Sequence, residues 1–365
     1  MKRRDNLLLF AYVVLLVAVI AQGQSAGAAD ESRLRTDSGT RLTGLLHNED
    51  CTDFFYTQTF PPGKAGEIAD RYVDVIAGAG VTVLFCKTNA RRTNYRSDVW
   101  EAFWDGYDPD GHDDQPFLAT IPETNRKQFR NLIHNMLEVH RQGVDYPARI
   151  IQRCRHHGVS PWISLRMNDV HFNDNLAHPF HGDLWRKAEL FRQGHPGYYA
   201  RGLDHAHAEV RRHYRALIAE TLQRYDIDGL ELDFMREPYL FSKGEEQAGG
   251  EILTQWLRET RTLVEEAAAR RGHSIRVGVR VPSEPETALG LGLDAPTWAQ
   301  EGLVDLVVAT PRWRTMHFDI PLRKWRTLLG DRVTLAGGLE SRCQPHPAAP
   351  VRHMDPECAV GAAVA

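Results

Sequence analysis

The chain has 365 residues, of which 42% are hydrophobic and 25% are charged, and its formal net charge is −4. This hydrophobic share is too high for a disordered protein and is sufficient for the core of one large domain. The sequence has no block of basic residues, which argues against nucleic acid as a partner.

The N-terminus is typical of a secretory signal peptide. Basic residues at positions 2 to 4 precede an apolar stretch from Leu7 to Ala21, and the small residues Ala26-Gly27-Ala28 follow. A transmembrane helix needs about 20 apolar residues, so this stretch is short for one, and an uncleaved anchor is the alternative. We expect residues 1–28 to direct export to the periplasm or the extracellular space, with no other membrane association. Their removal takes away three basic residues and one acidic residue, which moves the net charge from −4 to −6.

Short apolar segments alternate with helix-like segments through most of the chain. The expected strands are 42–47, 81–86, 162–167, 229–234, 275–281, 303–309 and 333–339. The expected helices are 63–79, 145–157, 206–225, 250–271, 296–301 and 321–329. This alternation predicts an α/β fold with a parallel sheet, and the number of strands favours a TIM-type (β/α)8 barrel over residues 38–340.

Two regions depart from the strand–helix alternation. Residues 90–143 form a long insertion after the second expected strand, with an aromatic and acidic loop and a helix near 125–142, and we expect this insertion to cap the site. Residues 341–365 are a proline-rich tail followed, at Asp355-Pro356, by the start of a helix.

Seven strands can be counted before the chain ends, so the sequence predicts a barrel truncated before its eighth strand. A complete seven-stranded barrel is the alternative. In a truncated barrel the first and last strands have unpaired edges, which would favour dimerisation or aggregation.

The most informative segment, residues 199–238, is predicted to form one helix followed by one strand. Glu231 and Asp233 interrupt an otherwise apolar strand and lie on the same side of it, because they are two residues apart. In a closed barrel that side is the interior, and catalytic groups lie at its carboxyl end. Asp233, nearer the mouth, is therefore the better catalytic candidate.

This segment resembles the glycosidase-type (β/α)8 barrels, especially the glycosyl-hydrolase-10-like group of secreted bacterial proteins. The matching residues are Glu209-Val210-Arg211 on the helix and the run from Tyr225 to Asp233, within about 40 residues. The resemblance implies a barrel that acts on carbohydrate, with Asp233 facing the sugar.

Polar residues also follow other expected strands. Asp50, after the first strand, is a candidate for direct participation, and Asn48 is a candidate for holding a sugar hydroxyl, although a solvated loop would show the same pattern. On the third strand, Arg166 shares a face with Ser164 and Asn168. Arg166 and Arg280 lie on the strands that flank Glu231, which predicts a buried Arg–Glu–Arg layer with a structural role for Glu231.

Glycoside hydrolysis needs one group that protonates the leaving oxygen and one that stabilises or attacks the anomeric carbon. Asp233 supplies one of them. Resemblance to the α-amylase pattern implies a glutamic acid at the end of the fifth strand. Here that strand ends at Ser283 without a carboxylate, which departs from the pattern of two catalytic carboxylates. The second group is then one of four residues placed at strand ends. They are Asp50, Asp169, His171 and Glu340.

Three arginines, Arg166, Arg236 and Arg280, suit an anionic sugar, because guanidinium groups bind carboxylates; the alternative is that they only neutralise the protein's own carboxylates. The catalytic candidates are Asp233, Asp50 and His171. The substrate-binding candidates are Asn48, Asn89, Arg166, Asn168, Asp169, Glu231, Arg236, Arg280, Trp313 as a sugar platform, and Glu340.

The spacing of histidines and cysteines predicts no metal site and no cofactor. We therefore expect an exported glycoside hydrolase acting on a poly- or oligosaccharide. The alternatives are a non-catalytic glycan-binding barrel and an inactive truncated fragment of such an enzyme.

Overall fold

The computed structural model describes residues 15–17, 42–235, 237–311, 318–344 and 349–364. Most of the expected signal peptide, with its basic start and its cleavage site, lies outside these residues, as do Arg236 and Trp313. Within the described part of the chain, none of the helices combines the length and the apolar character needed to cross a bilayer.

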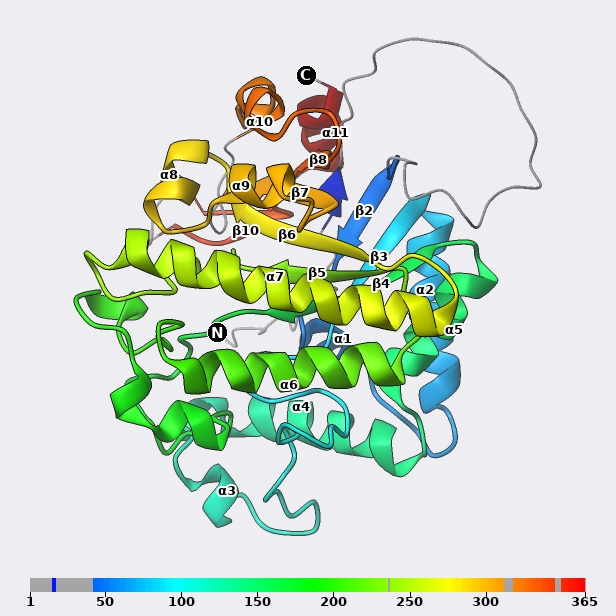
Figure 1. The fold of residues 1–365 in the computed structure, drawn as a ribbon. Helices are drawn as coiled ribbons and strands as arrows, with labels where there is room; N and C mark the ends of the chain where they lie inside the picture. The colour runs from blue at the N-terminus through cyan, green and yellow to red at the C-terminus, as the bar shows by residue number, and fades with distance from the viewer. Residues whose placement is uncertain (1–14, 18–41, 236, 312–317, 345–348, 365) are drawn as a thin grey trace.

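One curled sheet forms the centre of the molecule, with its strands in the order β1-β2-β3-β4-β5-β6-β7-β8 (Figure 1). Strands β2 to β8 are parallel, and each pairs with its neighbours in the sequence. Their bounds are Leu45–Asn48, Val81–Lys87, Ser160–Arg166, Gly229–Asp233, Arg276–Pro282, Leu306–Thr310 and Thr334–Gly337. The prediction of a TIM-type α/β barrel is confirmed. The sheet has seven parallel strands, and the described residues contain no eighth parallel strand.

The edge of β2 is occupied in the full-length chain. Strand β1 (Leu15–Val17) pairs with it in antiparallel register and also contacts β8. Because β1 belongs to the segment expected to be a signal peptide, the unpaired edge of β2 that the sequence predicts arises only when residues 1–28 are removed.

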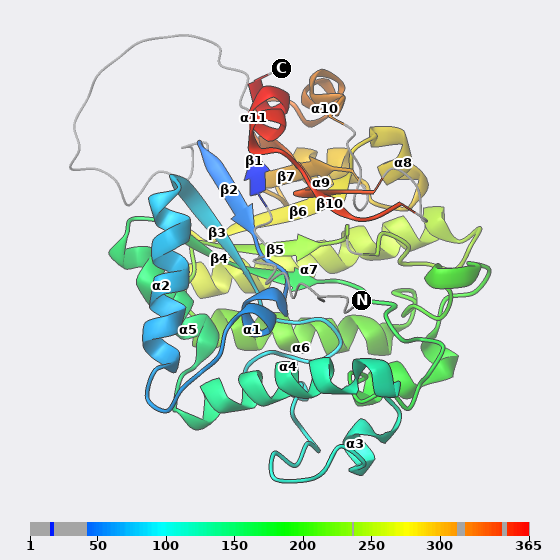
Figure 2. The same ribbon diagram turned by 180° about the vertical axis from the view of Figure 1, so that it is seen from behind.

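Helices cover the outer face of the sheet (Figures 1 and 2). Their bounds are α1 Asp53–Thr57, α2 Ala65–Gly78, α3 Pro116–Ala119, α4 Glu123–Arg141, α5 Tyr146–His156, α6 Ala208–Arg224, α7 Glu246–Arg271, α8 Pro285–Gly290, α9 Ala295–Gln300, α10 Leu322–Leu329 and α11 Pro356–Val364. All seven helices that the periodicity predicts are present. Two short strands, β9 (Arg342–Cys343) and β10 (Arg352–His353), pair with each other near the C-terminus.

Local sequence signals explain where several helices begin and end. Asp145 caps α5 by accepting a hydrogen bond from the Ala148 N–H (3.2 Å), and Asp294 caps α9 in the same way. Each cap is followed by a proline in the first turn, where the missing N–H costs nothing. Helix α7 ends at Gly272, whose φ of 76° suits glycine.

The interior of the sheet changes from apolar to charged along the strands. Trp162 on β4 packs there with Phe85, Leu306 and other apolar side chains near the amino ends. Glycines on the next two strands make room for the indole, because a Cβ at Gly229 would lie 2.3 Å from Trp162 and one at Gly278 would lie 2.9 Å away. Inward-facing residues nearer the carboxyl ends are polar, and they form the candidate site.

The insertion of residues 90–143 packs beside the carboxyl ends of the strands. Helix α4 contacts α1 and α2, and Asn135 donates to the Phe55 carbonyl (2.8 Å) in α1, the helix that follows β2. Thr120 donates to the Ala177 carbonyl (3.1 Å) in the loop after β4. The insertion therefore lies next to the loops that carry the candidate residues.

Candidate functional site

The register between neighbouring strands sets how far each inward-facing side chain lies from the mouth of the barrel, and side chains at the same distance form one level. Ser164 on β4 lies opposite Glu231 on β5. Two residues nearer the mouth, Arg166 lies opposite Asp233, which in turn lies opposite Arg280 on β6. The site therefore has a lower polar level around Glu231 and an upper charged level around Asp233.

Glu231 is fully buried and is held by side chains from three strands. Its Oε2 accepts hydrogen bonds from Asn48 Nδ2 (2.7 Å) and Ser164 Oγ (2.5 Å), and its Oε1 lies 3.5 Å from Arg280 Nη2. The expected Arg–Glu–Arg layer is wrong, because β4 presents Ser164 at the level of Glu231 and Arg166 lies one level higher. One arginine and two neutral donors contact this carboxylate, and Lys87 lies within electrostatic range of it.

Asp233 is 1% exposed, and both of its oxygens have partners. Lys87 Nζ binds Oδ2, the Met235 N–H donates to Oδ1 (2.9 Å), and Arg280 Nε lies 3.8 Å from Oδ1. Burial by itself would raise the pKa of Asp233, but the charges of Lys87, Arg280 and Arg166 outweigh it and hold the pKa well below the ordinary value of 3.8. Asp233 is therefore ionised at every physiological pH.

Sequence reasoning missed Lys87, the last residue of β3. Its side chain is 3% exposed, and burial lowers its pKa while the neighbouring Asp233 carboxylate opposes that change. The signal was present in the sequence: Val83, Phe85 and Lys87 alternate on one face, so a lysine ends an otherwise apolar strand on the side that faces inward.

A second ionic cluster joins the loops after β2, β3 and β4. Arg166 Nη1 donates to Asp169 Oδ2 (2.6 Å), and its Nη2 donates to Asp50 Oδ2 (3.1 Å). Arg91, which the sequence analysis also missed, lies 3.3 Å from Asp169. The Asp50 side chain is 18% exposed, so it is the accessible carboxylate of this cluster. Asn89 exchanges hydrogen bonds with the backbone of Arg166 (2.9 and 3.0 Å), which fixes that strand end.

Asp169 connects this cluster to a chain of hydrogen bonds that reaches the surface. Its Oδ1 lies 3.0 Å from His171 Nδ1, and His171 Nε2 lies 3.2 Å from the Tyr198 hydroxyl. Tyr198 in turn donates to Glu237 Oε1 (3.1 Å). Burial would raise the pKa of Asp169, but His171, Arg91 and Arg166 lower it far below 3.8. The carboxylate therefore holds the imidazole with Nε2 facing outward, and the His171 side chain is 30% exposed.

The remaining candidates have different surroundings. Asn168 is buried, and its amide binds backbone atoms of Leu203 and Asp169, so it organises the loop after β4. Glu340 follows β8 and is half-buried. Burial by itself would lower the pKa of Arg280, but the carboxylates of Glu231, Asp233 and Glu340 outweigh it and raise the pKa above its ordinary value. Glu340 therefore lies within electrostatic range of Arg280.

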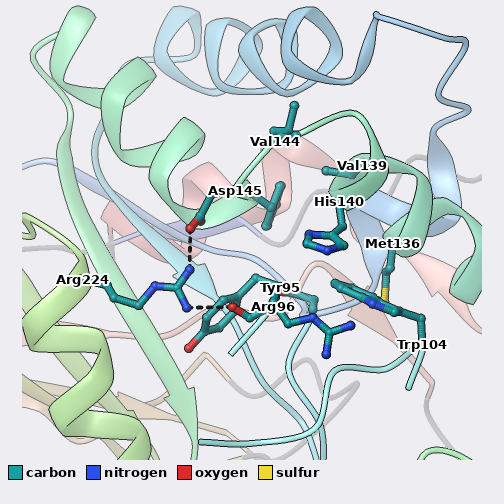
Figure 3. A pocket seen from close by; sticks show the side chains of 12 residues that line it. Tyr95, Arg96, Trp104, Met136, Val139, His140, Val144, Asp145 and Arg224 are labelled. Atoms are coloured by element: carbon teal, nitrogen blue, oxygen red, sulfur yellow. Dashed lines mark hydrogen bonds and ion pairs between the residues drawn. The ribbon is translucent and has the colours of Figure 1, made fainter. Parts of the chain in front are cut away.

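A cavity of about 260 Å³ lies outside the group of candidate residues. Helices α4, α5 and α6 and the loop from residue 94 to 104 enclose it, and none of the candidate residues lines it. Figure 3 shows Arg224 pointing toward Asp145, with 2.8 Å between Nη2 and Oδ2, while Arg96 lies over the ring of Trp104 at 5.3 Å. The two arginines that line the cavity, Arg96 and Arg224, therefore already have partners within the protein.

The comparisons with known proteins give resemblance of fold only. No family model matches the sequence, and no curated protein matches it. Among solved structures, the glycoside hydrolase domain of PgaB (BpsB) from Bordetella bronchiseptica is 10% identical, with a TM-score of 0.41 over 79% of this chain and 92% of that domain. Alpha-L-fucosidase isoenzyme 2 from Paenibacillus thiaminolyticus is 13% identical, with a TM-score of 0.40 over 87% of this chain and 48% of that one.

The maltogenic alpha-amylase AmyB from Thermotoga neapolitana is 9% identical, with a TM-score of 0.37 over 80% of this chain and 66% of that one. This chain spans only 28% of a cycloisomaltooligosaccharide glucanotransferase from Paenibacillus sp.. Likeness at this level carries no argument about activity. The strand order and the polar strand ends define a (β/α)-barrel protein with an ionic site at its mouth, and membership of the glycosyl-hydrolase-10-like group stays a prediction.

Proposed function

We propose that the protein is an exported carbohydrate-active barrel that hydrolyses a glycosidic bond at the carboxyl ends of β2, β4 and β5. The observation that carries this proposal is the meeting of ionised carboxylates with a carboxylate-bound histidine at one end of the barrel, where Asp50 and His171 reach the surface. Barrel enzymes place their catalytic groups at this end of the strands.

The electrostatics divide the chemical roles. A carboxyl group whose pKa is held far below 3.8 cannot donate a proton near neutral pH, so Asp233 suits stabilisation of the cationic transition state and not acid catalysis. Lys87 binds one of its oxygens, so this ammonium group has to move before a sugar can touch Asp233. Asp50 is the more exposed carboxylate, with 18% of its side chain accessible, and Arg166 and Thr52 bind its oxygens.

His171 is the proposed acid or base. Imidazole titrates near neutrality, and the carboxylate on Nδ1 directs Nε2 toward the Tyr198 hydroxyl, so the substrate has to replace that hydroxyl before it can exchange a proton with Nε2. The neighbouring Tyr198 hydroxyl marks the direction in which Nε2 points.

The ion pairs of the cationic side chains in the site bear on whether the substrate is a neutral or an anionic sugar. Lys87, Arg166 and Arg280 each bind a carboxylate of the protein. An anionic sugar would have to displace these carboxylates, so we propose a neutral glycan and retain an anionic one as the alternative to be tested.

Release of reducing ends from a panel of neutral and anionic polysaccharides tests the proposal. Asp233→Asn should reduce turnover at least ~10²-fold, because the lost charge acts in the transition state. The amide is nearly isosteric but leaves Lys87 without its carboxylate, so circular dichroism melting has to show that the variant is folded under the assay conditions. Asp50→Asn and His171→Gln show which accessible group takes part. Turnover of Asp233→Asn within about tenfold of wild type would move the chemistry to those two residues.

Binding of a polysaccharide without turnover would identify a non-catalytic glycan-binding barrel instead. N-terminal sequencing of the protein recovered outside the cytoplasm tests the proposed export and the cleavage near residue 28.

A further inference from the structure

A group of aromatic side chains lies beside His171 at the mouth of the barrel. Tyr198 and Tyr199 belong to a short 3-10 helix, Gly197–Tyr199, in the loop after β4, and Tyr239 lies in the loop after β5. The ring centroids of Tyr198 and Tyr199 are 5.4 Å apart, and those of Tyr199 and Tyr239 are 4.8 Å apart. The two loops therefore join through their aromatic residues next to the candidate acid.

Tyr198 is the exposed member of this group and is held in place. Its side chain is 40% exposed, whereas Tyr199 and Tyr239 are half-buried. Its hydroxyl is hydrogen-bonded to His171 and Glu237, and its ring meets the His171 ring edge-on, with 5.8 Å between centroids and an interplanar angle of 87°. These two hydrogen bonds fix the position of the ring of this exposed residue.

A fixed, exposed ring is suited to binding a sugar. One side of a pyranose carries C–H groups, and burying that side against an aromatic face removes apolar surface of both partners from water. Ordering a flexible side chain on binding costs about 0.5–1.5 kcal/mol, and Tyr198 largely avoids this cost because its hydroxyl is already bound.

We propose that Tyr198 is the platform of a sugar-binding subsite adjacent to His171, which takes one pyranose ring of a neutral polysaccharide. This inference rests on the proposed function, because it assumes a glycan substrate. Tyr199 lies at 79° to Tyr198, so the two rings cannot both lie flat against the same sugar. The subsite therefore holds a single sugar unit and places the next bond of the chain near His171.

Affinity gel electrophoresis tests the subsite without requiring turnover. The probes are soluble starch, dextran, galactomannan and hydroxyethylcellulose, with polygalacturonate as an anionic comparison. Tyr198→Ala should weaken retardation by the bound polysaccharide about tenfold, the upper range for one aromatic contact. Tyr198→Phe should lose less binding than Tyr198→Ala, because the ring remains and only the hydroxyl that orders it is lost.

Leu328→Ala is the matched control, since Leu328 is 42% exposed on α10 and should leave retardation unchanged. Circular dichroism melting confirms that each variant is folded, and complete loss of binding in a folded Tyr198→Phe overturns the subsite even if Tyr198→Ala does not fold.

The outcomes separate the subsite from the hydrolysis. Ring-dependent retardation without any release of reducing ends supports the subsite and overturns the proposed hydrolysis. Unchanged retardation of Tyr198→Ala, or no retardation of the wild-type protein by any probe, overturns the subsite. Equal loss of binding in Tyr198→Phe and Tyr198→Ala also overturns it, because the hydroxyl and not the ring would then carry the binding.

Discussion

Replacing Lys87 by methionine keeps the length of the side chain and removes the ammonium group from Asp233. Two unit charges about 3 Å apart attract each other by about 5 kcal/mol at an effective dielectric constant of about 20. Loss of one partner of a buried pair typically costs about 3–5 kcal/mol, because the other charge is left without compensation. In Lys87→Met the remaining partners of Asp233 are the Met235 N–H at 2.9 Å and Arg280 at 3.8 Å, which do not replace the lost charge.

We therefore expect Lys87→Met to lower the melting temperature by about 10 °C at pH 7, since each kcal/mol is worth roughly 2–4 °C in a chain of this size. Differential scanning calorimetry measures this shift. The folded-state pKa of Asp233 is depressed, so its ionisation stabilises the fold above pH ~4, and this stability is lost as the pH falls through the depressed pKa. The substitution raises the pKa of Asp233. The difference in melting temperature between wild type and variant should therefore narrow as the pH falls toward and below ~4.

The double variant Lys87→Met/Asp233→Asn provides the control. Its loss in melting temperature should be smaller than the sum of the losses in Lys87→Met and Asp233→Asn, because neither the lysine nor the aspartate is left as an unpaired charge. A melting temperature of Lys87→Met within about 2 °C of wild type at pH 7 would refute the reasoning and show that water screens the pair.

Three further predictions concern other parts of the fold. Glu231→Gln should reduce the free energy of unfolding by about 3–5 kcal/mol in urea denaturation, because it removes the charge opposite Arg280; an unchanged midpoint would show that Glu231 is solvated. Burial raises the pKa of Glu49 from 4.5 to about 7, so this group stabilises the fold below pH ~4.5 and that stability is lost as the pH rises through about 7. Glu49→Gln should therefore melt higher than wild type at pH 8 by an amount that disappears near pH 5, and equal melting temperatures at pH 8 would contradict the raised pKa. Residues 29–365 alone should dimerise or aggregate in sedimentation velocity, because β2 loses β1, and a monomer that melts cooperatively above ~60 °C would contradict this.

The strands and helices could be predicted because burial leaves a periodic record in the sequence. Strands such as Val81–Lys87 are apolar on both faces when helices cover a parallel sheet, and α6 shows its buried face at steps of three and four residues. The face of Glu231 and Asp233 followed from the same alternation. The level of Arg166 could not be predicted, because strand spacing gives the face of a side chain, whereas the register between β4 and β5 decides which residue it meets.

Contacts between loops could not be read from the sequence either. His171 and Tyr198 are 27 residues apart, with only short 3-10 helices and loops between them, and Tyr198 and Glu237 are 39 residues apart. The roles of Arg91 and Tyr198 became visible only when the loops after β3, β4 and β5 were placed together. The antiparallel pairing of Leu15–Val17 with β2 also has no signal in an apolar stretch that is typical of a leader.

The indole of Trp162 determines how a polymer can use this barrel. Because the ring fills the interior near the amino ends of the strands, and Gly229 and Gly278 let it fit tightly, that end offers no exit. A chain molecule therefore cannot thread through the barrel, so it has to lie across the open end and depart by the route it came. A ligand of the site therefore has to enter and leave at the carboxyl ends of the strands.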